Sequence, residues 1–102
     1  MVTPLKGSQK KYLRGLAHSM NPSALVGHKG ITPTLMDEIN QALGAAELIK
    51  IKFNDHKEKE AKNTLIEEIT LGTHSQLAGM VGHVAILFRQ NPDPEKRKIK
   101  LP

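Results

Sequence analysis

The sequence lacks cysteine and tryptophan altogether, and its 102 residues contain only three aromatic side chains. Without cysteine, the chain can form neither a disulfide framework nor a thiolate metal site. No apolar run approaches the roughly 20 residues that a membrane-spanning helix needs, so we expect no membrane partner. Residues 1–6 have no apolar core like that of a secretory signal, and we therefore expect a cytoplasmic protein. A chain of this length fits one domain with one core.

Acidic residues are also missing from the first third of the chain. Residues 1–36 carry five Lys or Arg side chains and no Asp or Glu. Residues 37–71 hold eight acids against five lysines, and residues 72–102 hold five basic side chains against two acids. The formal charge of +5 is therefore distributed as +5, −3 and +3 over these segments. Because an ordinary solvated surface mixes its signs, this asymmetry favours a binding face for a polyanion, which nucleic acid would satisfy.

A glycine-bounded turn joins two predicted elements near the end of the acid-free segment. Its residues are Gly27, His28, Lys29 and Gly30. The two glycines allow a positive φ and a close approach of the backbone to a ligand. Thr32 is a predicted N-cap and Pro33 a predicted first helical residue, so loop amides and the helix dipole would bind a phosphate together with the charge of Lys29. Two glycines at this spacing also occur in plain turns, which is the alternative interpretation.

The pattern over residues 7–20 predicts a first helix with one basic side. Apolar residues recur at the spacing of a core-facing stripe. They are Leu13, Leu16, Ala17 and Met20. Across from this stripe a basic ridge repeats every four residues, with one more cation beside it. The ridge consists of Lys6, Lys10, Arg14 and His18, with Lys11. No carboxylate lies four residues away to neutralise these charges, so we expect the ridge to contact phosphates; a solvated helix surface is the alternative.

Further apolar patterns predict the middle elements. The run at residues 24–26 predicts a buried strand that ends at the turn, and residues 33–43 predict a helix that Gly44 ends. Alternation over residues 47–53 predicts a half-buried strand. Its polar side carries Lys50 and Lys52. For these two lysines, solvation of an open face and an extension of the binding surface have equal support.

The last part of the chain predicts a helix and a hairpin. Asp55 is a predicted N-cap with Glu58 in a capping-box arrangement, and the acidic face of this helix is expected to point away from nucleic acid. Residues 76–81 and 83–88 predict a hairpin about Gly82. The second of these strands is apolar on both faces, which suits a central strand.

The predicted order is α-β-α-β-α-β-β, which is an α/β chain of the two-layer α+β type. Residues 91–94, with two prolines, mark the predicted domain boundary. We therefore expect a single domain over residues 1–91 and a basic tail over residues 92–102. The tail is either flexible or laid along the surface through Ile99 and Leu101.

This element order, together with three local segments, resembles the CRM family, named for chloroplast RNA splicing and ribosome maturation. The segments are residues 13–18 (LRGLAH), 26–32 (VGHKGIT) and 47–52 (ELIKIK). In particular, the chain is similar to the stand-alone bacterial YhbY-type members, over roughly residues 5 to 90. The resemblance implies a four-stranded mixed sheet packed with helices, similar to the C-terminal domain of translation initiation factor three. It also implies RNA binding and association with precursors of the large ribosomal subunit.

The resemblance also implies which residues bind RNA. The family's loop corresponds to Gly27, His28, Lys29 and Gly30, and its basic first helix to Lys10, Lys11, Arg14 and His18. Lys6 and Thr32 complete the candidate RNA-binding residues. Nothing is implied for the tail after Asn91. In KH domains a G-x-x-G joins two helices, whereas here a strand is predicted before it, so a KH domain is disfavoured.

The expected partner is RNA, in particular large-subunit ribosomal RNA within pre-ribosomal particles, bound by a monomer without a cofactor or small-molecule substrate. With so few aromatic rings, contact with phosphates and RNA shape is expected in place of base stacking. A general module for DNA or another RNA is the first alternative. An RNA-processing enzyme is the second, but the five histidines show no i, i+4 metal pair and the turn is not a P-loop. We therefore expect neither a catalytic nor a metal site.

Overall fold

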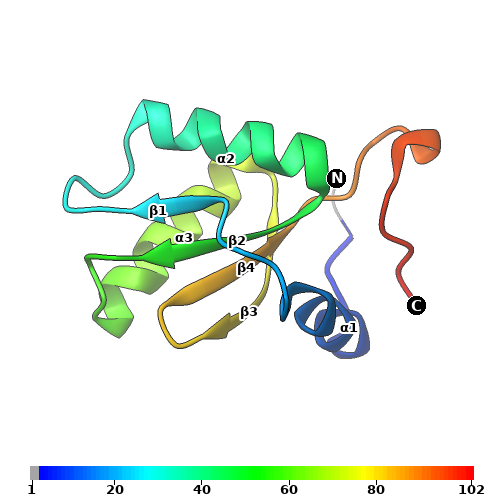
Figure 1. The fold of residues 1–102 in the computed structure, drawn as a ribbon, viewed down its shortest axis with the longest axis horizontal. Coiled ribbons are helices and arrows are strands. Elements are labelled where there is room, and N and C mark those ends of the chain that lie inside the picture. The colour runs from blue at the N-terminus through cyan, green and yellow to red at the C-terminus, as the bar shows by residue number, and fades with distance from the viewer. Residues whose placement is uncertain (1–2) are drawn as a thin grey trace.

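The computed structural model describes residues 3–102, so Met1 and Val2, which the predicted domain of residues 1–91 includes, lie outside the described part. Helices and strands follow one another in the predicted order α-β-α-β-α-β-β, and a short 3-10 turn comes last (Figure 1). The elements are α1 (Gly7–Ala17), β1 (Ala24–Val26), α2 (Pro33–Ala46), β2 (Leu48–Phe53), α3 (Lys59–Thr73), β3 (Gln76–Val81), β4 (Val84–Phe88) and η1 (Pro94–Lys96). No helix in this part of the chain combines the length and apolar character needed to span a bilayer.

The four strands form one mixed sheet in the order β1-β2-β4-β3, which confirms the predicted α/β chain of the two-layer α+β type. β1 runs parallel to β2, with α2 as the crossover, whereas β4 pairs antiparallel with both β2 and β3. β4 is thus a central strand, as its apolar sequence predicts. Gly82, at φ 59°, supplies the left-handed backbone angle of the β3–β4 turn, so the predicted hairpin is also confirmed.

The side chains of β2 point alternately to the two faces of the sheet. Ile49, Ile51 and Phe53 are fully buried under α2 and α3, in the larger hydrophobic cluster. Leu48 faces the other way, into a smaller cluster with Leu13 of α1. Burying each of these large apolar side chains stabilises the fold by about 1.5–3 kcal/mol. Two helices therefore cover one face of the sheet, and α1 covers part of the opposite face (Figure 1).

α1 ends at Ala17, three residues before the predicted end at Met20. The carbonyl oxygens of His18 and Met20 accept hydrogen bonds from the Nζ of Lys50, at 3.3 and 3.0 Å. The ammonium group satisfies carbonyls where the helix dipole favours positive charge. A side chain of β2 thus contributes to the end of α1, and the periodicity of the helix itself contains no sign of it.

α2 continues past the predicted stop at Gly44, and Glu47 is its C-cap instead of the first strand residue. The backbone of Glu47 adopts φ 65°, and its N–H donates to the carbonyl oxygen of Leu43 at 2.9 Å. The Glu47 side chain is fully buried. Glu47 in this conformation therefore ends the helix, and not Gly44, which lies within it.

Glu47 also fastens the C-terminal tail. One of its carboxylate oxygens accepts the N–H of Asn91 at 2.6 Å, and the other accepts those of Lys98 and Ile99 at 2.6 and 2.9 Å. Burial alone would raise the pKa of Glu47, but these hydrogen bonds and the nearby Arg97 outweigh it and hold the pKa below its ordinary value. The tail side chains that pack against the smaller cluster are Ile99 and Leu101. The tail thus lies along the surface of the protein.

α3 begins at Lys59, so the prediction that Asp55 caps this helix is wrong. The carboxylate of Asp55 accepts the N–H of its neighbour His56 at 2.7 Å. His56 adopts φ 53°, which an α-helix does not allow. The N–H groups of Asn54 and Asp55 both donate to the carbonyl oxygen of Val26, at 2.9 and 3.3 Å. This segment is therefore held to the end of β1, and the helix starts only beyond it.

Candidate nucleic-acid interface

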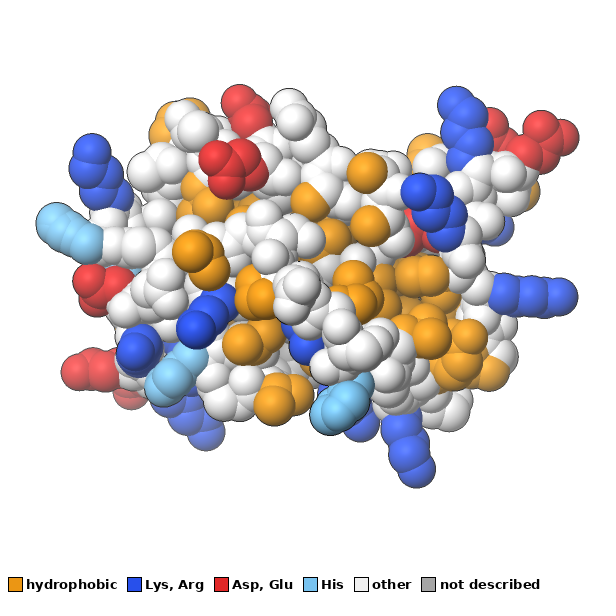
Figure 2. Space-filling model, in the orientation of Figure 1, with side chains coloured by type: hydrophobic (Ala, Val, Ile, Leu, Met, Phe, Trp, Pro, Cys, Tyr) orange, Lys and Arg blue, Asp and Glu red, His pale blue; other side chains and the backbone are white. Residues whose placement is uncertain are grey.

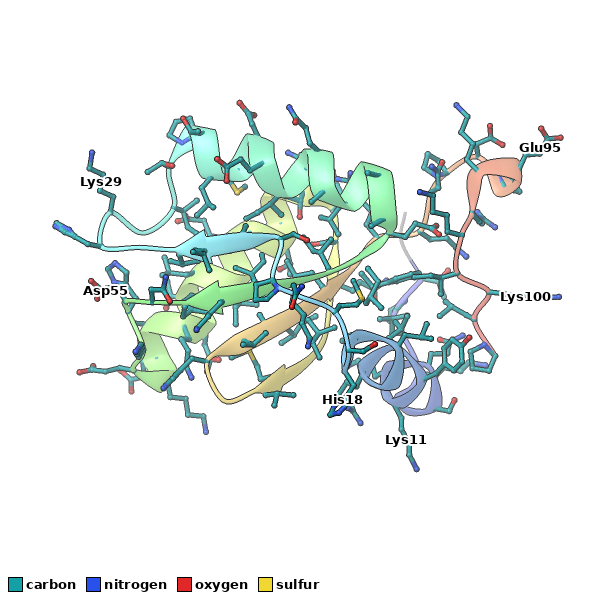
Figure 3. The ribbon with its side chains drawn as sticks, in the orientation of Figure 1. Lys11, His18, Lys29, Asp55, Glu95 and Lys100 are labelled. Carbon is teal, nitrogen blue, oxygen red and sulfur yellow. The ribbon has the colours of Figure 1, made fainter. Side chains whose placement is uncertain are left out.

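The G-x-x-G loop follows β1 at one end of the molecule, where Lys29 extends away from the body of the protein (Figure 3). The N–H of Gly30 donates to the carbonyl oxygen of Gly27 at 3.0 Å and closes the turn. Gly30 is buried and adopts φ 68°, a conformation that favours glycine. An added Cβ at Gly27 would meet no atom within 4 Å, and His28 is exposed. The loop is thus a tight turn that presents two side chains and bare backbone to solvent.

The N-terminus of α2 is capped as predicted, because the Thr32 hydroxyl accepts the N–H of Leu35 at 3.1 Å and Pro33 is the first helical residue. Pro33 has no N–H, and the N–H of Leu35 already donates to Thr32. Within residues 3–102, Thr34 is then the first-turn residue whose amide has no acceptor. An anion at this loop would therefore rely on the loop amides and on Lys29 more than on the helix end.

His56, from the loop between β2 and α3, supports the G-x-x-G loop from the side. Its Nε2 lies 3.0 Å from the carbonyl oxygen of His28. A carbonyl oxygen can only accept, so the hydrogen is on Nε2. The same nitrogen lies 3.6 Å from the position that a Cβ on Gly30 would occupy. His56 was not among the residues predicted from the sequence, since its contact depends on the pairing of β1 with β2 and leaves no local signal.

The basic ridge lies along α1, but its members differ in exposure. Lys11 and His18 are exposed, and both point away from the sheet (Figure 3). Lys10 is half-buried. Lys6 precedes the helix at the N-cap position, and its backbone N–H donates to the side chain of Gln9 at 2.9 Å. The ridge is therefore a real surface of α1, with its most accessible charges toward the outer side of the helix.

Arg14, another member of the basic ridge, also docks α1 onto the sheet. Its Nη1 donates to the carbonyl oxygen of Ala78 at 3.2 Å, where the pairing of β3 with β4 is interrupted by a register shift. The aliphatic stem of Arg14 lies across Gly79, and a Cβ there would collide with it. Further N–H groups of the guanidinium remain for a phosphate, so Arg14 can serve both the fold and a ligand.

The two lysines of β2 have different surroundings. Lys50 is half-buried, and its ammonium group bonds to the carbonyls at the end of α1. Lys52 lies on the same face, nearer to the G-x-x-G loop, and is exposed. The two lysines therefore have different roles. Lys50 bonds to the end of the docked helix, which neither interpretation of the sequence anticipated, while Lys52 faces solvent and remains available to a ligand.

In the described part of the chain, the elements that carry the two parts of the predicted site contain no acidic residue. None of the ten Asp and Glu residues, all within residues 3–102, belongs to α1, to the loop at residues 27–32 or to any strand. Figure 2 shows acidic side chains along the top and the side margins of the molecule, whereas basic and histidine side chains lie among hydrophobic ones over its lower part. The loop and α1 lie apart, with uncovered sheet between them, and Asp55 lies near the loop (Figure 3).

The predicted site residues thus fall into two groups. The structure brings Gly27, His28, Lys29 and Gly30 into one loop, with Thr32 at the start of α2, and it places Lys6, Lys10, Lys11, Arg14 and His18 along α1. Over the described range 3–102, no three His, Cys, Asp or Glu side chains approach one another closely enough to hold a metal ion. The arrangement suits contacts with several phosphates along one polymer.

A family model, several relatives and a solved structure each match nearly the whole chain. The model of the CRS1 / YhbY (CRM) domain matches residues 5–89. A Haemophilus influenzae protein named "RNA-binding protein" is 37% identical over 101 residues, which cover 99% of this chain and 98% of the relative. The Bacillus subtilis protein named "Probable RNA-binding protein YqeI" is 35% identical over 98 residues, with 96% and 99% covered. The solution structure of a hypothetical protein from Staphylococcus aureus superposes with a TM-score of 0.82 at 31% identity, covering 97% of this chain and 100% of that one.

Proposed function

The chain belongs to the CRS1 / YhbY (CRM) domain family, as its resemblance indicates, and on this premise we propose that it binds RNA through the G-x-x-G loop and the basic ridge of α1. Relatives that match almost its whole length carry the names of RNA-binding proteins, which supports the proposal. The structural observation that carries it is the absence of acidic residues from α1, from the loop at residues 27–32 and from all four strands, over residues 3–102. The cations on these elements, Lys29 and the basic ridge among them, attract a polyanion.

The loop holds one phosphate of the RNA backbone. Lys29 supplies the charge, the N–H groups of His28 and Lys29 are donors, and the open space at Gly27 lets the phosphate approach the backbone. The hydrogen bond from His56 restrains the loop before RNA arrives, which lowers the ordering cost of binding. The loop thus acts as a pre-formed phosphate clamp.

The basic ridge contacts further phosphates of the same RNA. Contacts of this kind position the RNA without reading its sequence. If about five cations contact single-stranded RNA, the logarithm of the binding constant should fall with the logarithm of the salt concentration with a slope on the order of −3.5. A slope near zero would contradict this mechanism.

The experiment that tests the proposal is a charge reversal at the loop, His28→Asp with Lys29→Asp. Both side chains are exposed, so the free energy of unfolding, followed by thermal melting, should stay within about 0.5 kcal/mol of that of the unmodified protein. RNA binding should be lost. The matched control is Gln41→Asp with Lys59→Asp, which changes the formal charge equally at exposed positions of α2 and α3. Binding that survives the loop variant, or falls equally in the control, overturns the proposal.

For the partner, we propose large-subunit ribosomal RNA within pre-ribosomal particles, bound without catalysis by a monomer in the cytoplasm. The family resemblance supports this assignment. Ultraviolet cross-linking in cells tests it, with both the RNA reads and the cross-linked peptides identified. Reads concentrated in large-subunit ribosomal RNA, with peptides from residues 6–31, agree with the assignment. Reads scattered over other RNAs would remove the ribosomal role, and reproducible cleavage of labelled RNA would assign an enzymatic one.

A general nucleic-acid-binding module is the alternative, because contacts to phosphates do not by themselves distinguish RNA from DNA. Competition between RNA and DNA strands of matched sequence separates the two functions. A preference for DNA would favour the alternative over the RNA-binding function proposed here.

A further inference from the structure

A row of side chains crosses the sheet on the face that α1 covers only in part. From one edge of the sheet to the other, the strand register pairs Leu25, Lys52, Val84 and Val81. Directly paired residues point to the same face, so these side chains form one line across all four strands, which we call the open row. Its face is that of Leu48, which packs against α1.

The open row lies largely in solvent although three of its four side chains are apolar. Leu25 is 53% exposed and Val81 is 63% exposed, while Val84 is partly exposed. The row begins beside the G-x-x-G loop, because Leu25 is separated from Gly27 by a single residue. α1 covers the opposite end of the same face, around Leu48. The row therefore occupies the sheet between the two parts of the proposed RNA site.

The one charged side chain within the open row is positive, and another cation lies at the neighbouring β3–β4 turn. Lys52 belongs to the row itself. Lys62 reaches from α3 to the β3–β4 turn, where its Nζ lies 3.3 Å from the carbonyl oxygen of Gly82 and 3.2 Å from Nδ1 of His83. In residues 3–102, the strands and α1 carry no carboxylate side chain, and Asp55 lies beyond the ends of β1 and β2. A second copy of this face would be repelled, and a purely apolar partner would bury Lys52 without a counter-charge. A polyanion that also has flat apolar groups matches both features.

We propose that the open row is the path of a single RNA strand between the G-x-x-G loop and α1, an inference that rests on the proposed function. Bases lie against the aliphatic side chains of Leu25, Val81 and Val84, while Lys52 meets the phosphate between them. In an A-form duplex the bases are stacked inside the helix and cannot reach such a row. The protein therefore prefers single-stranded RNA, although the row contains no aromatic ring.

The test is a paired variant, Leu25→Thr with Val81→Thr, which keeps residues suited to strands but reduces the apolar contact. Fluorescence anisotropy with labelled single-stranded RNA, at several salt concentrations, measures the affinity. We expect it to fall about five- to tenfold with an unchanged salt slope, because no cation is lost. Lys52→Gln should instead reduce the magnitude of the slope by about 0.7. The matched control is Leu71→Gln on α3, where the side chain is 70% exposed, and it should bind like the unmodified protein.

The outcomes distinguish the path from the proposed function. If the threonine variant and Lys52→Gln keep the original affinity and slope while the loop variant loses binding, the path is wrong and RNA binding through the loop stands. If the loop variant itself still binds, the proposed function is wrong. If the protein binds a duplex of the same sequence as tightly as the single strand, the path is also wrong. The path is likewise wrong if sedimentation shows that the threonine variant differs in association state from the unmodified protein, because the row would then be a contact between copies of the chain. Thermal melting monitors folding, and the exposed Lys52 carries the test alone if the threonine variant unfolds.

Discussion

The Nε2 of His56 donates a hydrogen bond of 3.0 Å to the carbonyl oxygen of His28 and so joins the loop after β2 to the loop after β1. His56 itself adopts a positive φ of 53°. A bond between two loops reduces the number of conformations that each can adopt. His56, which lies outside the predicted site, thus helps to restrain the conformation of the G-x-x-G loop together with the two glycines.

Replacing His56 by asparagine removes this bond without adding backbone strain, because asparagine tolerates a positive φ but is too short to reach His28. One hydrogen bond contributes about 0.5–1.5 kcal/mol, so RNA binding should weaken about two- to tenfold. Titration of labelled RNA by fluorescence anisotropy measures the change.

The matched control for this prediction is His74→Asn. Like His56, His74 adopts a positive φ, of 56°, but it is exposed and lies at the C-cap of α3, away from the G-x-x-G loop. The control should bind RNA like the unmodified protein. Equal losses in both variants would show that the hydrogen bond to the loop is not the cause.

The two glycines of the loop should respond differently to alanine. Gly30 adopts φ 68°, where a Cβ costs about 1–2 kcal/mol, so Gly30→Ala should lower the free energy of unfolding by that amount. Gly27→Ala meets open space and should change it by less than about 0.5 kcal/mol. The new methyl group would still keep a phosphate away from the backbone, so RNA binding should weaken. Urea denaturation with parallel binding titrations tests both, and equal stability of the two variants would contradict the argument.

Glu47 should make the stability of the protein depend on pH. Its folded-state pKa lies below the ordinary value of 4.5, so its stabilising contribution is fully present above that value and is lost as the pH falls toward the lower, folded-state pKa. Glu47→Gln turns an amide group toward backbone donors and should cost about 1–3 kcal/mol near neutral pH. Urea denaturation at about pH 7 and about pH 4 measures the free energy of unfolding of the unmodified protein and of Glu47→Gln. The difference between these two free energies should be smaller at the lower pH. A constant difference would count against this role.

Two glycines near Arg14 should respond to alanine with opposite signs. A methyl group on Gly79 collides with the stem of Arg14 and should break its hydrogen bond to Ala78, which lowers stability by about 0.5–1.5 kcal/mol. Gly15 lies inside α1, and an added Cβ there meets no atom within 4 Å, so Gly15→Ala should stabilise by about 0.5–1 kcal/mol. Thermal melting of both variants tests the pair. A loss of stability in Gly15→Ala would mean that this side of α1 is not free.

The errors of the sequence prediction lie at the ends of elements. Asp55 has the local pattern of an N-cap, and Met20 has that of the last residue in a helical stripe. In the folded chain the carbonyl oxygen of Val26 holds the segment before α3, and the ammonium group of Lys50 bonds to the carbonyls after α1. These partners are far away in sequence and meet only when the sheet forms, so no local pattern can reveal them.

The sequence by itself determined the order of the elements, the turn at Gly82, the cap at Thr32 and the acid-free first segment, because these depend on apolar periodicity, local backbone preference and composition. Only the tertiary structure decided that Lys50 stabilises α1 while Lys52 stays exposed, and that His56 supports the loop. The physical reason is that the role of a polar side chain depends on which backbone groups come within hydrogen-bonding distance. Those distances follow from strand register and helix docking, which pairs of residues far apart in the chain establish together.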